Sequence, residues 1–275
     1  MRREDGPVLT VSRRAVLRAL IRRDFLITRS YRAAFLLDLF FGVMNLVIFY
    51  FISKTVSLRT GSIQGAPTYF AFASIGIILT VVMQSATTGL ARRIREEQLT
   101  GTLELLTVQP ISAGEMAVGL TGFPFAFGTV RAAGYILFAG AFLGLDLGNS
   151  DFLGFALVLV AAGVALSAIG ILMGAVVIAV KQGEALAGVV AFGFSLLSGA
   201  LFPRSILPQW LQALGRLLPT RFALDGMRRA LFEGGGWSGD LVALLATCLV
   251  LAPISVAAFA WILQTVKRRG TLSQY

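Results

Sequence analysis

Six long apolar stretches constrain the fold of this chain more than any other feature. They are residues 33–51, 68–90, 116–143, 152–180, 185–202 and 241–266. Each approaches or exceeds the roughly 20 apolar residues that an α-helix needs to cross a bilayer. Because hydrocarbon offers the backbone no hydrogen-bonding partner, a spanning segment must be a helix or part of a closed barrel. The two-residue alternation of barrel strands is absent, so the sequence predicts an all-α integral membrane protein with a six-transmembrane-helix bundle.

The distribution of basic residues predicts the orientation of the bundle. Nine arginines precede the first apolar stretch, and three basic residues follow the last one. Basic residues beside spans usually mark the cytoplasmic side, and two cytoplasmic termini place sixteen basic residues inside against seven outside. We therefore expect both termini in the cytoplasm. A nucleic-acid partner explains the net charge of +10 less well, because these clusters adjoin apolar helices and lack interleaved aromatic residues.

Two segments outside the apolar stretches also show helical patterns. In residues 11–32, most arginines fall on one side of a helical projection and apolar residues on the other. This predicts an amphipathic helix along the inner membrane surface, with a solvated basic tail as the alternative. In residues 203–236, Pro208 can start a helix whose leucines recur at steps of three and four. A second short helix is predicted after it, with Asp225 and Arg229 spaced to form a pair.

Residue types that support catalysis are missing or scattered. The chain has no histidine, which removes the commonest general base and most transition-metal sites. Its one cysteine, Cys248, lies inside the last apolar stretch, and no Gly-x-x-x-x-Gly-Lys-Ser/Thr phosphate loop occurs. The carboxylates form no cluster at a membrane face. We therefore expect no catalytic residue and no metal site, and a membrane-embedded enzyme is the weaker alternative.

The loop at residues 91–112 has the most specific local pattern. Gly101 interrupts one helical stretch, and Thr102 is suited to be the N-cap of the next. Glu104 then lies in the first turn, where a negative charge favours the positive end of the helix dipole, and Pro110 stops the helix. The pattern predicts a short, stiff helix with charges on one side and leucines on another, suited to docking. The alternative is a loop that these residues only cap and stiffen.

Two separated motifs carry a resemblance to a known family. The first is Glu97-Gln98-Leu99-Thr100-Gly101-Thr102-Leu103-Glu104-Leu105-Leu106, followed by Pro110-Ile111-Ser112. The second is Ser198-Gly199-Ala200-Leu201-Phe202-Pro203, then Leu207-Pro208-Gln209-Trp210-Leu211, Leu218-Pro219-Thr220 and Gly226-Met227-Arg228-Arg229. In this order they resemble the signatures of the ATP-binding-cassette (ABC) type-2 export permeases. The resemblance covers the whole chain, which would form one transmembrane permease domain of residues 1–275.

The resemblance implies a transport subunit without its own ATPase site. In similar proteins two permease units, a homodimer or a related heterodimer, assemble with two cytoplasmic ATPase subunits that bind ATP and magnesium, so no cofactor is expected on this chain. The loop at residues 91–112 would be the coupling helix that enters a groove of the ATPase. The residues implied in ATPase coupling are Glu96, Glu97, Gly101, Thr102, Leu103, Glu104, Leu106 and Pro110. The implied location is the plasma membrane of a prokaryote, with membrane lipid as a further partner.

The resemblance also implies a gate on the outer side. The two short helices of residues 203–236 would dip back into the outer leaflet and close the pathway, and an interfacial anchor is the alternative. The residues implied in this gate are Phe202, Pro203, Leu207, Pro208 and Pro219. Drugs, lipids and glycan-like molecules all remain open as cargo, and an amphiphilic drug or lipid-like molecule is preferred because the spans offer few hydrogen-bonding groups.

Arg131 is the most costly residue to place, because it lies midway along the third apolar stretch. An intramembrane charge normally faces the protein interior or a wet cavity, and Asp38 in the first stretch is the nearest candidate counter-ion by depth. A structural salt bridge and a charge facing the pathway both remain open. An ATP-independent secondary transporter is a further alternative, although the repeated broken spans typical of that class are absent.

Overall fold

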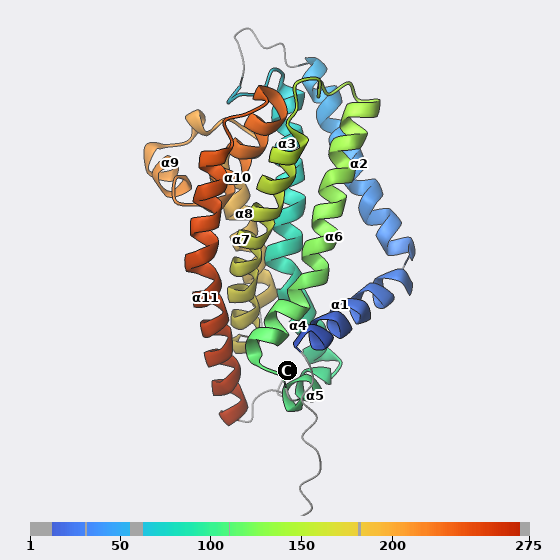
Figure 1. Ribbon diagram of the computed structural model, residues 1–275, viewed down its shortest axis with the longest axis vertical. Coiled ribbons are helices and arrows are strands. Elements are labelled where there is room, and N and C mark those ends of the chain that lie inside the picture. The colour runs from blue at the N-terminus through green and yellow to red at the C-terminus, as the bar shows by residue number, and fades with distance from the viewer. Residues whose placement is uncertain (1–12, 31, 56–62, 110, 181–182, 270–275) are drawn as a thin grey trace, which may run out of the picture.

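The computed structural model describes residues 13–30, 32–55, 63–109, 111–180 and 183–269, which form helices joined by short connections (Figure 1). In chain order the elements are α1 (Arg13–Ser30), α2 (Arg32–Thr55), α3 (Tyr69–Met83), η1 (Gln84–Thr88), α4 (Gly89–Leu99), α5 (Thr102–Val108), α6 (Ala113–Phe142), α7 (Phe152–Ala179), α8 (Gly183–Ser198), η2 (Arg204–Ile206), α9 (Gln209–Gly215), α10 (Pro219–Arg228), η3 (Arg229–Glu233) and α11 (Ser238–Arg269). Here η1 and η3 are π-helical turns, and η2 is a 3-10 turn. The prediction of an all-α protein is confirmed for these residues.

Five helices of the described chain are long and apolar enough to cross a membrane: α2 from Leu36, the continuous α3–η1–α4 helix, α6, α7 and α11. The predicted stretch at residues 185–202 forms the shorter helix α8 instead. Its 16 residues reach only about 24 Å at 1.5 Å per residue, less than the roughly 30 Å of a hydrocarbon layer. Gly199 takes a left-handed φ of 74°, which ends α8 before its apolar sequence ends. Helices of spanning length are therefore confirmed for five of the six stretches.

Local sequence explains where the long helices begin. At the start of α6, Ser112 and Glu115 form a capping box in which each side chain accepts a hydrogen bond from the other's backbone N–H, at 3.2 and 2.8 Å. At the start of α7, the Asp151 carboxylate accepts from the Gly154 N–H at 2.8 Å and from the Trp237 indole N–H at 2.7 Å. These hydrogen bonds lower the pKa of Asp151. Because Trp237 directly precedes α11, they also join the starts of α7 and α11.

The long helices run side by side, and α7 is the one around which the others pack. It is apolar on all sides, and it contacts α11, α4, α10 and α3. In Figure 1, α1 lies obliquely against α6 near the lower end of the bundle, and α5 lies at that same end. The short helices α9 and α10 lie at the opposite end. These are called the α5 end and the α9 end below.

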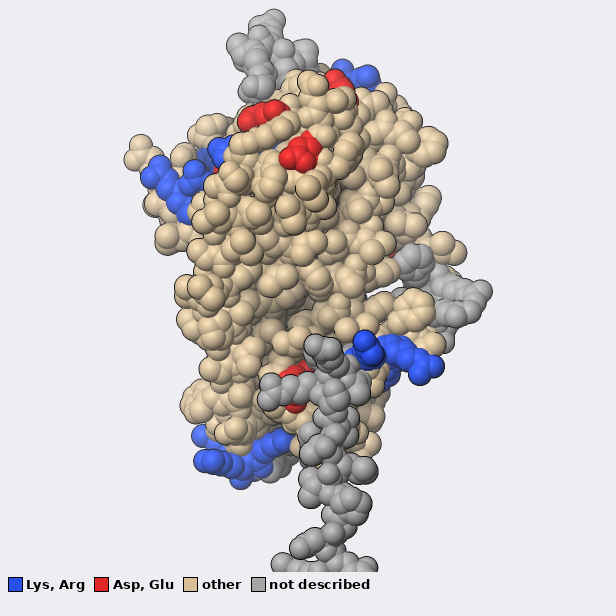
Figure 2. Space-filling view, in the orientation of Figure 1, with Lys and Arg blue, Asp and Glu red and all other residues tan. Residues whose placement is uncertain are grey.

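Charged side chains gather toward the two ends of the molecule. On the face that Figure 2 shows, the middle of the bundle is almost entirely uncharged, whereas basic and acidic side chains lie nearer the α5 end and the α9 end. A hydrocarbon layer disfavours charged side chains at its centre. The surface therefore agrees with the five helices of spanning length.

Close contact between two of these helices depends on glycine. A Cβ added to Gly170 of α7 would clash with the carbonyl oxygen of Ala86 in η1, whereas one added to Gly134 of α6 would meet no atom within 4 Å. We expect Gly170→Ala to lower the apparent free energy of unfolding by about 1–3 kcal/mol through overpacking. Gly134→Ala should leave it unchanged or raise it by up to about 1 kcal/mol, because alanine favours a helix. Thermal unfolding of the detergent-solubilised proteins measures both, and equal melting midpoints would contradict the close α7–η1 contact.

Candidate functional site

The turn between α4 and α5 sets the direction of α5. Gly101 adopts a left-handed φ of 71°, which glycine tolerates without steric cost, and it occupies the N-cap position of α5. The prediction that Thr102 is the N-cap is therefore wrong, and Thr102 is the first residue of the helix. Its hydroxyl donates instead to the carboxylate of Glu97 in α4, which ties the two helices across the turn. Glu104 lies in the first turn, as predicted.

A cluster of charged side chains joins α1 to this turn. The Asp24 carboxylate of α1 is fully buried, and one of its oxygens lies 2.9 Å from Arg93 Nη2 and 3.1 Å from Arg23 Nε. Arg23 also lies 2.9 Å from the Glu97 oxygen that does not contact Thr102. Arg93 donates to Glu96 at 3.0 Å. The α1–α4 charge cluster is defined by these residues: Arg23, Asp24, Arg93, Glu96 and Glu97.

The large apolar residues around α5 divide between two faces. Leu103 and Leu106 are buried in the core at the α5 end, so they hold the helix in place. Leu105 and Val108 are 66% and 84% exposed, and Leu99 at the end of α4 is 65% exposed. Large apolar side chains that gather on a surface mark interaction sites. Leu99, Leu105 and Val108 are called the α5 face.

The predicted coupling residues therefore have different places in the structure. Gly101 forms the turn, and Glu97 and Thr102 join α4 to α5 across it. Leu103 and Leu106 anchor α5, Glu96 and Glu104 are exposed, and Pro110 lies outside the described residues. The structure adds Leu105 and Val108. Their spacing of three residues is the sequence signal that could have identified a second apolar face. The structure also adds the cluster residues Asp24 and Arg93, whose proximity no local pattern reveals.

The predicted gate residues lie at the α9 end. Two short helices occur there, as predicted: α9 begins after Pro208, and α10 begins at Pro219. Phe202, Pro203 and Leu207 are partly buried, Pro208 is exposed and Pro219 is buried. They thus border α9 and α10.

The predicted pairing of Asp225 with Arg229 is wrong. Asp225 of α10 accepts two hydrogen bonds from Arg204 of η2, at 2.7 and 3.0 Å. The two N–H donors of the Arg204 guanidinium match the two oxygens of the Asp225 carboxylate. Arg229 can therefore bind another partner. Arg229, the first residue of η3, donates to Asp240 of α11 at 2.7 Å. The segment α10–η3 is therefore bonded to η2 through one residue and to α11 through the other.

Arg228 joins α10 to two further elements. Its side chain is only 1% exposed, and its guanidinium carbon lies 4.0 Å from the centre of the Phe72 ring. It donates to the Gln64 side chain at 3.0 Å and to the carbonyl oxygens of Phe72 and Gly199 at 3.3 and 3.4 Å. Burial lowers the pKa of Arg228 to about 9, against the opposing effect of the Asp225 carboxylate. The group therefore stays charged at neutral pH and connects α10 with α3 and the end of α8.

Arg131 and Asp38 form an ion pair between α6 and α2. Arg131 also donates to the Tyr135 hydroxyl at 3.1 Å. The side chain of Arg131 is 12% exposed, whereas that of Asp38 is 56% exposed. The contact between Arg131 and Asp38, which their similar depth in the spans predicted, is present. It lies at the surface of the bundle, where the Asp38 carboxylate is exposed.

Elements from both ends of the molecule lie within the region that matches a known protein family. A model of the ABC-2 type transporter family matches residues 15–232. The matched region runs from α1 to η3, so it includes the α1–α4 charge cluster, α5 and the two short helices. No curated protein matches the chain.

The buried Asp24 carboxylate allows a direct test of the charge cluster. Arg93→Ala leaves Asp24 with Arg23 as its remaining partner in the cluster, and breaking a buried pair from one side destabilises a protein by about 3–5 kcal/mol. We expect a loss of this order, and a smaller loss in the double variant Asp24→Asn with Arg93→Gln, which removes both charges. Apparent melting temperatures in detergent micelles measure the difference. A double variant no more stable than Arg93→Ala would show that the burial of Asp24 does not depend on Arg93.

Proposed function

The chain belongs to the ABC-2 type transporter family, and from this we propose that it forms the translocation pathway of an ATP-driven exporter. It is a transmembrane permease subunit, and the permease domain of this family carries no nucleotide-binding domain. ATP is therefore hydrolysed on partner subunits. The proposed cargo is an amphiphilic drug or a lipid-like molecule, because the apolar spans offer few hydrogen-bonding groups to a polar solute, and a glycan-like molecule is the alternative.

The proposed orientation places the α5 end in the cytoplasm, in the plasma membrane of a prokaryote. The last turn of α11 carries Lys267, Arg268 and Arg269 at this end, and basic residues beside spans favour the cytoplasmic side. The five long helices then cross the membrane, with α8 as a sixth, shorter membrane segment. In this arrangement α1 lies along the inner surface, and α9 and α10 dip into the outer leaflet.

We assign ATPase coupling to α5, which enters a groove of the ATPase subunit. The observation that carries this assignment is the α5 face: exposed apolar side chains on a short helix whose opposite side is anchored by Leu103 and Leu106. Glu104 is exposed in the same helix and adds a charge to the docking surface. The contacts of Glu97 with Thr102 and Arg23 hold α5 to α4 and α1. A displacement of α5 is therefore transmitted to α1 as well as to the α3–η1–α4 helix.

The pathway lies at the interface of two permease units in this proposal. Phe202, Pro203, Leu207, Pro208 and Pro219 form the gate on the outer side. Arg131 and Asp38 line the pathway, because a half-exposed carboxylate on a span is costly in lipid and is better accommodated in a wet cavity. ATP binding favours one arrangement of the two units through contacts that differ between the closed and open states.

Substitutions in the α5 face test the docking surface. Leu105→Asp and Val108→Asp each remove apolar burial worth about 1.5–3 kcal/mol at the interface, so each should weaken binding of the ATPase subunit by about tenfold or more. The ABC ATPase that assembles with this permease is titrated onto the permease in lipid nanodiscs, and its affinity and ATP hydrolysis are measured.

Leu217→Asp is the matched control, because Leu217 is 80% exposed near α9, at the opposite end. It should bind the ATPase with the affinity of the unchanged protein. Unchanged affinity in both α5 variants would remove α5 as the docking helix.

A further inference from the structure

Helix α11 reaches from α5 to residues 204–233 (η2 to η3), which are called the outer segment below. The 32 residues of α11 span about 48 Å at 1.5 Å per residue, and the helix packs along α7. In Figure 1 it runs from the α9 end to the α5 end. Its last turn is bonded to α5, which lies far away in the sequence, and its first turn is bonded to η3, which lies shortly before it.

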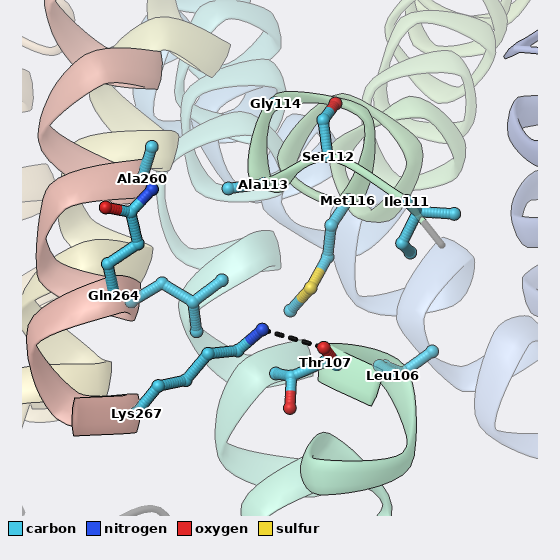
Figure 3. Close-up of a pocket in the computed structure, with 11 residues that line it drawn as sticks. Leu106, Thr107, Ile111, Ser112, Ala113, Gly114, Met116, Ala260, Gln264 and Lys267 are labelled. Carbon is cyan, nitrogen blue, oxygen red and sulfur yellow. Dashed lines mark hydrogen bonds between the residues drawn. The ribbon is translucent and has the colours of Figure 1, made fainter. Parts of the chain in front are cut away.

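At the α5 end, Lys267 caps the coupling helix. Its ammonium group donates to the backbone carbonyl of Thr107 at 2.7 Å (Figure 3). Thr107 lies in the last turn of α5, where helix carbonyls lack partners within the helix and the dipole attracts a cation. Among the described residues, this hydrogen bond is the one that joins α11 to α5.

A cavity lies beside this bond. Its volume is about 390 Å³, and it is lined by the C-terminal part of α5, the start of α6 and the last turns of α11, including Leu106, Met116, Leu263 and Gln264 (Figure 3). Close packing of side chains does not fill the space between α5 and α11 here. Leu106 of α5 and Leu263 of α11 belong to one apolar cluster, and Lys267 adds the hydrogen bond that joins the two helices beside the cavity.

At the α9 end, α11 is bonded to the outer segment. Asp240, in the first turn of α11, accepts from Arg229 at 2.7 Å, and the Asp240 side chain is only 10% exposed. Arg229 begins η3 directly after α10. Arg204 connects η2 to the same segment through Asp225, so η2, α10 and the start of α11 form one hydrogen-bonded group.

We propose that α11 is a mechanical link that carries a displacement of α5 to the outer segment, with Lys267 and Asp240 as its two points of attachment. The proposal rests on the proposed function, because the ATPase supplies the displacement. The helix α11 continues from Ser238 to Arg269, although Pro253 in its interior donates no backbone hydrogen bond. Coupling through it requires that both ends have contacts that differ between two states. Lys267 acts as a positioning residue, since it touches α5 and neither the ATP nor the cargo.

The test measures whether ATP changes the outer segment through Lys267. Ile206→Cys is introduced together with Cys248→Ser, because Ile206 is 68% exposed and belongs to η2. The complex with its ATPase subunits is reconstituted in lipid vesicles, and the rate of labelling by a membrane-impermeant maleimide is compared with and without ATP.

Lys267→Gln should reduce the ATP-induced change in rate by about fivefold or more, with ATPase affinity unchanged. Arg268→Gln, which alters an exposed neighbouring cation, should leave the change intact, and Lys267→Arg should largely restore it.

The other attachment point provides an independent arm. In the same background, Arg229→Gln removes the charged donor to Asp240 and should reduce the ATP-induced change as Lys267→Gln does. An ATP response of the Lys267→Gln complex equal to that of the parent would overturn the link while leaving α5 docking intact. Failure of the parent complex to bind the ATPase would overturn the proposed function itself, so the two failures are distinguishable.

Discussion

The burial of the Asp24 carboxylate is the interaction on which the α5 end depends. A carboxylate without access to water is tolerated only beside cations that are themselves well placed. Asp24 therefore fixes Arg23 and Arg93 against each other, and with them α1 against α4. Arg23 extends this constraint to Glu97, whose other oxygen accepts the Thr102 hydroxyl at the start of α5. A seven-residue helix, whose direction the Gly101 turn sets, is thus also held by charges that begin on a separate element.

The long helices could be predicted because the bilayer, rather than the rest of the chain, dictates their length and composition. Residues 152–180, for example, correspond closely to α7 (Phe152–Ala179). The exception is the stretch at 185–202, in which apolar residues continue through the turn after α8. That turn depends on the left-handed Gly199 and on close packing of the Ala200 backbone against Gly76 of α3. Hydropathy alone does not distinguish a helix from an apolar turn that packs on a neighbouring span.

The candidate site could be predicted as a segment but only partly as a surface. A helix as short as α5 offers two apolar faces, and its periodicity does not decide whether Leu103 or Leu105 faces the protein. One charge pair could be predicted from the sequence, and another could not. Arg131 and Asp38 could be matched because spans contain few charges, which leaves few combinations. Near α10 several arginines compete for Asp225, and the outcome depends on tertiary positions that sequence spacing does not contain.

The shortness of α8 has a consequence for the surrounding lipid. Next to the 28 residues of α7, a helix of 16 residues leaves the apolar layer unmatched over part of its depth. A bilayer accommodates such mismatch by thinning locally or by drawing head groups inward, at an elastic cost that depends on acyl-chain length. The chain continues from α8 directly into the segment that carries Phe202 and Pro203. If α8 lies in the membrane as proposed, membrane thickness becomes a physical variable that acts on the segment carrying Phe202 and Pro203.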